Sequence, residues 1–106
     1  MQNDINSCII EGTMGKAPDE NGKFYVVTKR VYKNETTGEK LVQRTHIFVV
    51  ANGNFKKIAE QNYAKDRGIR IVGRLQTDRR GRAEIYAEHI EFKPVFDINA
   101  TETAED

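Results

Sequence analysis

Five short stretches of the chain have the pattern of β-strands: the first is apolar and compact, and in the others apolar and polar residues alternate, as they do in strands that bury one face. These stretches cover residues 5–12, 23–33, 40–52, 68–78 and 83–92. In the fourth stretch, Ile69, Ile71 and Leu75 share one parity while arginines occupy the other. In the fifth, the apolar parity changes between Ala87 and Ile90, which predicts a β-bulge near Glu88 and His89. Polar turn sequences separate the stretches: DENG, NETTGE and RRGR.

One segment has helical spacing instead. Between the third and fourth strands, apolar and small residues recur at intervals of three and four, namely Phe55, Ile58, Ala59, Asn62 and Tyr63. Asn54 is a candidate N-cap, and Gly68 follows the end of the pattern. The predicted order is therefore β-β-β-α-β-β. Five short strands with one helix after the third fit an all-β, five-stranded OB-fold barrel, a fold that commonly binds oligonucleotides.

The 106 residues suffice for one domain, which we place at 1–96, followed by a short acidic segment at 97–106 that we expect to be disordered. That segment carries four acidic residues and no cation, which leaves 17 basic against 12 acidic residues, about +5, in the rest of the chain. A basic body suits an anionic polymer as partner, although an ordinary mixed surface would have a similar balance.

Composition also narrows the expected cellular location and the kinds of site that the chain can form. A single cysteine, Cys8, rules out an internal disulfide and favours a reducing, cytoplasmic location. No stretch reaches the roughly 18 consecutive apolar residues of a membrane helix, and the polar start is unlike a signal peptide. Cys8, His46 and His89 are too scattered for a metal site, and no catalytic cluster is recognisable, so we expect neither metal, cofactor nor enzymatic activity.

The third strand carries candidate binding chemistry. Alternation places Ile47, Val49 and Ala51 on one face, which suits a core, and His46 and Phe48 on the other. Two rings on the outer face of a small barrel could stack nucleic-acid bases, an interaction worth roughly 1–3 kcal/mol per base whatever the sequence. The alternative is that Phe48 belongs to the core or to a subunit contact.

Several segments resemble the bacterial single-stranded DNA-binding protein family. The likeness covers about residues 3–93 and rests on four segments in the same order as in the family. They are NDINSCIIEGTMGKAPDE, TGEKLVQRTHIFVVANG with the following KKIAE, DRGIRIVGRLQTD and AEHIEF. The resemblance implies an OB-fold, usually homotetrameric, that coats single-stranded DNA in replication, recombination and repair and binds without reading sequence.

The resemblance also implies where bases would stack. The family's four ring positions correspond here to Tyr32 in the hairpin, His46 on the third strand, Asn52 at its end and Arg80 after the fourth strand. Only Tyr32 remains an aromatic of the usual kind, and Phe48 could replace part of the lost surface. The family's long glycine-rich linker with an acidic, Pro-Phe-ended tip is missing, which puts recruitment of replication and repair proteins in doubt.

Basic residues complete the predicted site. Those expected to contact phosphates are Arg30, Lys33, Arg44, Arg74 and Arg80. The leading interpretation is a single-stranded DNA-binding protein, a homotetramer or a dimer, that acts in the cytoplasm on the nucleoid. Two alternatives stay open: a primosomal replication accessory protein of the same fold, and an OB-fold that serves mainly as a protein-interaction module.

Overall fold

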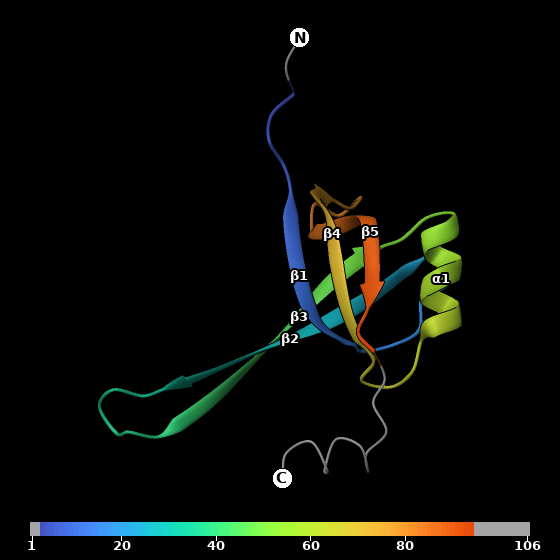
Figure 1. Cartoon of the computed structure of the whole chain (residues 1–106). Coiled ribbons are helices and arrows are strands. Elements are labelled where there is room, and N and C mark those ends of the chain that lie inside the picture. The colour runs from blue at the N-terminus through green and yellow to red at the C-terminus, as the bar shows by residue number, and fades with distance from the viewer. Residues whose placement is uncertain (1–2, 95–106) are drawn as a thin grey trace.

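The computed structural model describes residues 3–94 and contains the predicted five strands and one helix in the predicted order (Figure 1). They are β1 (Cys8–Met14), β2 (Lys23–Lys33), β3 (Lys40–Val50), α1 (Asn54–Asn62), β4 (Gly68–Thr77) and β5 (Ala83–Phe92). The all-β class with a helix between the third and fourth strands is confirmed. The first strand begins and ends later than predicted. The predicted acidic segment, 97–106, lies outside the described residues.

The strands close into a barrel in the order β1-β2-β3-β5-β4. All neighbouring pairs are antiparallel except β3 and β5, which run parallel and pair only through Val49 and Val50. The predicted inward parity of β3 is confirmed, since Val49 and Ala51 are fully buried. With them, the core contains Met14, Phe24, Val26, Ala59, Ile69, Ile71, Ile85, Ala87 and Ile90.

The predicted β-bulge in β5 is present. Val72 of β4 pairs with His89, but the next residue, Gly73, pairs with Ala87, so Glu88 has no partner in the ladder. Gly73 allows this close approach, because a Cβ atom there would lie 2.1 Å from the carbonyl oxygen of Tyr86. The bulge therefore depends on the glycine in the facing strand.

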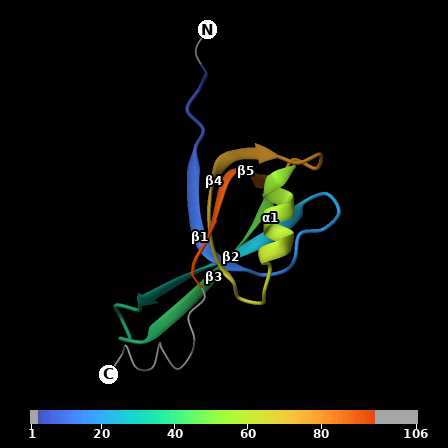
Figure 2. The same cartoon turned by 45° about the vertical axis from the view of Figure 1, so that its right-hand side comes forward.

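The helix α1 packs beside β5 with the predicted face (Figure 2). Ala59 is fully buried, and Phe55 and Tyr63 pack against the core. The predicted cap at Asn54 is wrong: Asn54 is the first helical residue, and the N-cap is Gly53, which has no side-chain capping hydrogen bond. Gly53 has φ 58°, a left-handed conformation that glycine adopts readily where the chain turns sharply after β3.

Two turns share one construction. The sequence D-x-x-G-[K/R] occurs at 19–23 and at 78–82. In each turn, the aspartate Oδ1 accepts hydrogen bonds from two backbone N–H groups, those of Asn21 and Lys23 or those of Arg80 and Arg82. These backbone bonds hold the pKa of the two aspartates, Asp19 and Asp78, below the ordinary value. Both carboxylates therefore stabilise their turns more strongly when they are ionised.

The strands β2 and β3 extend far beyond the barrel as a two-stranded ribbon, which we call the arm (residues 28–45; Figures 1 and 2). Pairing continues without a break from Lys23 opposite Val50 to Lys33 opposite Lys40. Burial decreases along β2: Phe24 and Val26 lie in the core, whereas the residues after Thr28 are exposed. The arm is thus a continuously paired but largely solvent-exposed element.

Candidate nucleic-acid interface

Three rings cluster on the outer face of β2 and β3, at the base of the arm. The register places Tyr25 directly opposite Phe48 and Val27 opposite His46, so all of these side chains share one face. The Tyr25 ring lies 5.2 Å from the His46 ring and 6.2 Å, edge-on, from the Phe48 ring. His46 is exposed, and Phe48 is 40% exposed. The predicted outward pair of His46 and Phe48 is therefore confirmed, with Tyr25 as a third member.

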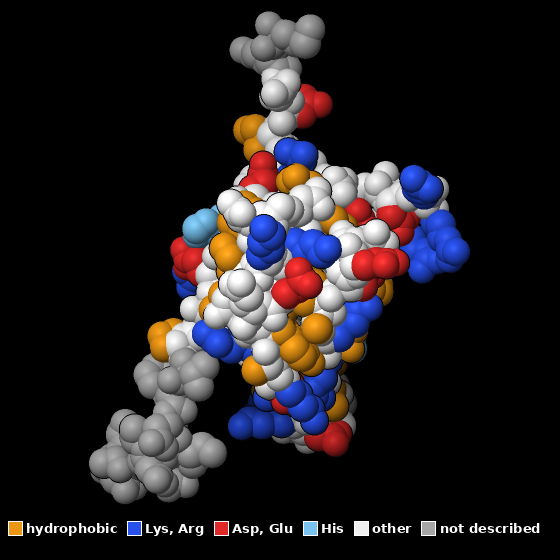
Figure 3. Space-filling view, turned by 90° about the vertical axis from the view of Figure 1, so that its right-hand side faces the viewer, with side chains coloured by type: hydrophobic (Ala, Val, Ile, Leu, Met, Phe, Trp, Pro, Cys, Tyr) orange, Lys and Arg blue, Asp and Glu red, His pale blue; other side chains and the backbone are white. Residues whose placement is uncertain are grey.

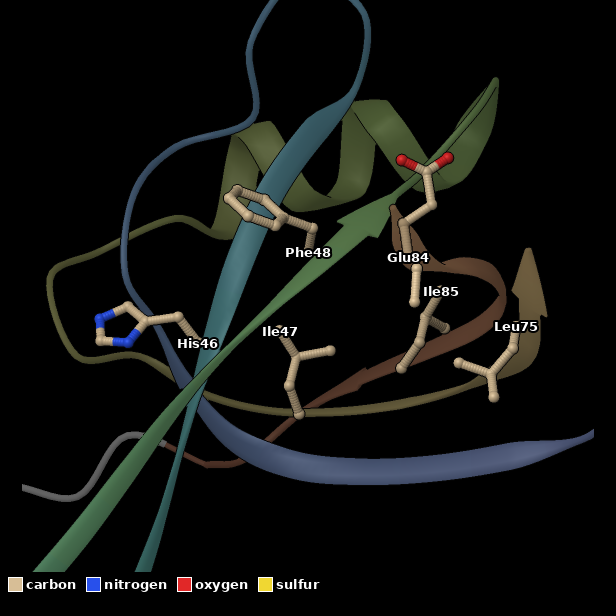
Figure 4. Close-up of a pocket in the computed structure, with 7 residues that line it drawn as sticks. His46, Ile47, Phe48, Leu75, Glu84 and Ile85 are labelled. Carbon is tan, nitrogen blue, oxygen red and sulfur yellow. The ribbon is translucent and has the colours of Figure 1, made fainter. Parts of the chain in front are cut away.

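A hollow of about 210 Å³ lies beside these rings, where β3 and β5 diverge. It is lined by His46, Ile47, Phe48, Leu75, Ala83, Glu84 and Ile85. Figure 4 shows His46 and Phe48 on one side of β3, and Ile47, Ile85 and Leu75 on the other. Leu75 is 53% exposed, so apolar surface reaches solvent at this end of the barrel. The ring cluster and the hollow form one largely apolar region.

Lys23 is held over the Phe48 ring by two carboxylates. Its Nζ lies 5.3 Å from the ring centroid, 3.1 Å from Oε1 of Glu84 and 3.7 Å from Oδ2 of Asp78. Glu84, only 7% exposed, also accepts a hydrogen bond from the amide of Gln76 at 2.8 Å. The ion pairs fix a cation beside the ring cluster, although part of its charge is already neutralised.

A second contact between a cation and an aromatic ring lies on the neighbouring strands β4 and β5. The Arg74 guanidinium carbon is 4.6 Å from the Tyr86 ring centroid, and Arg74 also forms an ion pair with Glu88 at 3.4 Å. Asn52, predicted as a contact position, is exposed and places Nδ2 3.5 Å from the Tyr86 hydroxyl. The structure thus brings Arg74 and Asn52 to the same tyrosine, at the edge of the ring cluster's face.

The predicted arm residues do not all lie on the same face. The ring cluster's face continues along the arm through the opposed pairs Lys29–Arg44 and Lys33–Lys40. Tyr32 and Arg30 have the other parity in β2, so they occupy the opposite face of the ribbon. There the Arg30 guanidinium carbon lies 5.2 Å from the Tyr32 ring centroid, and Tyr32 is 40% exposed. Tyr32 and Arg30 are thus separated from His46 and Phe48 by the ribbon itself.

Arg80 lies in the turn between β4 and β5, and its side chain is exposed. Arg79 and Arg82 lie in the same turn, which borders the hollow at Ala83. On the face seen in Figure 3, Lys and Arg side chains lie at the lower end, at one upper edge and over the middle, with acidic side chains among them.

Sequence reasoning missed Tyr25, Lys23 and Tyr86 as members of this surface. Tyr25 has the outward parity of β2, but only the register with β3 places it opposite Phe48. Lys23 and Tyr86 depend on contacts between distant segments, such as Lys23 with Glu84. A usable signal was the pair of aromatics Tyr25 and Tyr86 at outward positions of predicted strands.

Other chemistry is sparse over residues 3–94. In that range, no group of three or more His, Cys, Asp or Glu side chains could hold a metal ion. Cys8 is partly buried, and burial raises the pKa of its thiol, so the reactive thiolate is disfavoured. The same residues include no helix long and apolar enough to cross a membrane.

The closed barrel and the single helix between β3 and β4 define an OB-fold. No protein-family model and no curated protein sequence matches the chain significantly. The chain does match solved structures, at low sequence identity.

A Plasmodium falciparum SSB in complex with ssDNA is 18% identical, with a TM-score of 0.72 over 89% of this chain and 99% of that one. A small single-stranded DNA-binding protein from Streptomyces coelicolor is 18% identical, with a TM-score of 0.65 over 88% of this chain and 96% of that one. A deletion mutant of the Thermus aquaticus single-stranded DNA-binding protein is 19% identical, with a TM-score of 0.66. That match covers 85% of this chain and 51% of the Thermus chain. At these identities, the similarity establishes the fold.

Proposed function

We propose that the chain binds single-stranded DNA without reading its sequence. The observation that carries this proposal is the continuity of the ring cluster with the cationic face of the arm. Tyr25, His46 and Phe48 offer flat surfaces for bases, and the next outward pair along the ribbon, Lys29 and Arg44, offers charges for phosphates. Stacking on rings and contacts to phosphates together bind a strand of any sequence.

The geometry favours a single strand over a duplex. Bases of a duplex are stacked on one another, so their faces are unavailable to the rings of Tyr25, His46 and Phe48. A flexible single strand can turn its bases toward the rings while its phosphates follow the arm. The hollow beside Phe48 and Leu75 offers further apolar surface to an unstacked base.

The structural neighbours support the proposal, since the Plasmodium protein was solved with ssDNA on the same fold. We extend it to the roles that the sequence resemblance implies: a non-enzymatic, cofactor-free binding protein of DNA replication, recombination and repair. It would act in the cytoplasm on the nucleoid as a homotetramer or a dimer. Co-purification with a helicase, or a dimer in solution, would favour the primosomal accessory role.

Fluorescence anisotropy of a labelled oligo-dT strand, titrated with the protein at several salt concentrations, tests the proposal. The label belongs on the DNA, because the chain has no tryptophan. We expect tight binding to the single strand, with a log-log salt slope of about −0.7 for each phosphate contacted, and little binding to a duplex of equal length. Weak binding to both would contradict the proposal and favour the protein-interaction module.

A further inference from the structure

The outer face of the arm carries cations that oppose one another. Lys29 lies directly across from Arg44, and Lys33 directly across from Lys40. All four side chains are exposed and share the face that leads from the ring cluster. Between the two pairs, on the same face, Val31 lies opposite Val42, and these side chains are 53% and 47% exposed.

Like charges directly opposite each other destabilise a β-ladder, so these pairs cost the free arm stability. The Lys and Arg residues on strands outside the arm differ: Lys23, Arg70 and Arg74 each form an ion pair with a carboxylate, as does Lys93 directly after β5. Within residues 3–94, the four cations of the arm's outer face have no such carboxylate partner. Two adjacent unpaired cations would be stabilised by one anion placed between them.

The spacing of the pairs suits a nucleic-acid strand. They are four residues apart along each strand, which corresponds to roughly 13 Å at the rise of a β-strand. One strand of a B-form duplex advances 3.4 Å along the helix axis for each phosphate, and an extended strand, which is not wound about an axis, advances roughly twice as far. The two pairs are therefore separated by roughly the span of two nucleotides.

We propose that each like-charged pair of the arm binds one phosphate, and that the two phosphates are two linkages apart on the same strand. The two nucleosides between them, with the one linkage that joins these nucleosides, lie over Val31 and Val42, where an apolar surface suits a sugar or a base. The strand then reaches the rings of His46 and Phe48 from the arm's outer face. Tyr32 and Arg30, on the opposite face, do not lie on this path. The inference rests on the proposed function.

The salt dependence of binding tests the pairing, because its slope counts the phosphates that are neutralised. If one pair holds one phosphate, the double variant Lys29→Gln/Arg44→Gln should make the slope shallower by about 0.7, and Lys33→Gln/Lys40→Gln should do the same. If the four cations contacted four separate phosphates, the salt slope of each double variant would instead become shallower by about 1.4, which would overturn the inference. The matched control is Lys57→Gln/Lys65→Gln, two exposed lysines on and after α1, with an unchanged slope.

The spacing is tested with two oligo-dT strands that carry the same number of charged linkages, the others being neutral methylphosphonates. One strand has its charges at every second linkage, and the other at every third. We expect the first to bind several-fold more tightly to the wild-type protein, and either double variant of the arm to remove the difference. Equal binding of the two strands to the wild-type protein would overturn the two-linkage spacing.

The free protein supplies a further readout. Neutralising a pair removes repulsion, so each double variant should melt at the same temperature as the wild type or higher, most clearly at low salt. A lower melting temperature would mean that the cations stabilise the arm, against the inference. An unchanged salt slope in both double variants, with tight wild-type binding, would overturn the inference alone. If the wild-type protein binds no single strand, both the inference and the proposed function fail.

Discussion

Replacing Phe48 by alanine should weaken binding to single-stranded DNA more than it weakens the fold. The ring is 40% exposed on the outer face, so a base can reach only part of it. Stacking on an aromatic side chain is worth roughly 1–3 kcal/mol per base. For a partly exposed ring we take the lower part of this range, about 1–2 kcal/mol, which corresponds to a roughly 5- to 30-fold loss of affinity.

The cost to folding should be smaller. Inside the protein, the Phe48 ring touches the edge of Tyr25 and lies under the Lys23 ammonium, whereas the core is built from residues of the opposite parity. We therefore expect Phe48→Ala to change the free energy of unfolding by no more than about 1 kcal/mol. Thermal melting of the free variant checks this point before its affinity is interpreted.

The matched variant is Phe48→Trp, which keeps a ring and adds the chain's only indole. It should bind oligo-dT at least as tightly as the wild type, and its emission should be quenched when a base stacks on it. Anisotropy at several salt concentrations should give Phe48→Ala an unchanged salt slope, since the phosphate contacts remain. Unchanged affinity in Phe48→Ala, or no quenching in Phe48→Trp, would refute a stacking role for this residue.

Four further outcomes are expected. Tyr32→Ala should leave both the single-strand affinity and the oligomeric state seen by gel filtration close to those of the wild type, because Tyr32 lies on the face opposite the proposed path; a clear loss of affinity would show that the strand also contacts that face, as the sequence resemblance implies. Deleting residues 97–106 should modestly strengthen binding, because an anionic segment competes with DNA for the cations, and weaker binding would count against this. Gly73→Ala should lower the melting temperature by several degrees, since the added Cβ meets a backbone oxygen at 2.1 Å. Finally, acidification should destabilise the wild type more than Asp78→Asn. The pKa of Asp78 is lowered in the folded state, so its ionised carboxylate stabilises the fold at pH values above the ordinary pKa of aspartate. This stabilisation is lost as pH falls below about 4. Equal acid sensitivity in denaturation curves would contradict that reasoning.

The elements of the fold could be predicted because their signals are local. Period-two alternation located four of the strands closely, and the spacing of Phe55, Ile58 and Ala59 located the helix. The parity change in the fifth strand located the bulge opposite Gly73. The helix cap was wrong because Gly53 has a backbone conformation that does not depend on a capping side chain.

The candidate site was harder to predict because it depends on register. Alternation showed that His46 and Phe48 share a face, but the face of Tyr32 relative to them follows only from which residues oppose one another across the hairpin. Pairing Val31 with Val42 puts Tyr32 on the opposite side of the arm. The same register places Tyr25 against Phe48, whereas the ion pair of Lys23 with Glu84 joins segments about sixty residues apart.

The central claim is that the outer face of β2 and β3 binds single-stranded DNA. Amide chemical shifts of the ¹⁵N-labelled protein, followed by NMR during titration with oligo-dT, test it most directly. We predict that the largest shifts fall on β2 and β3 around Tyr25, His46 and Phe48 and continue into the arm at Arg44, while α1 changes little. Shifts confined to α1, or no shifts at saturating oligo-dT, would contradict the account.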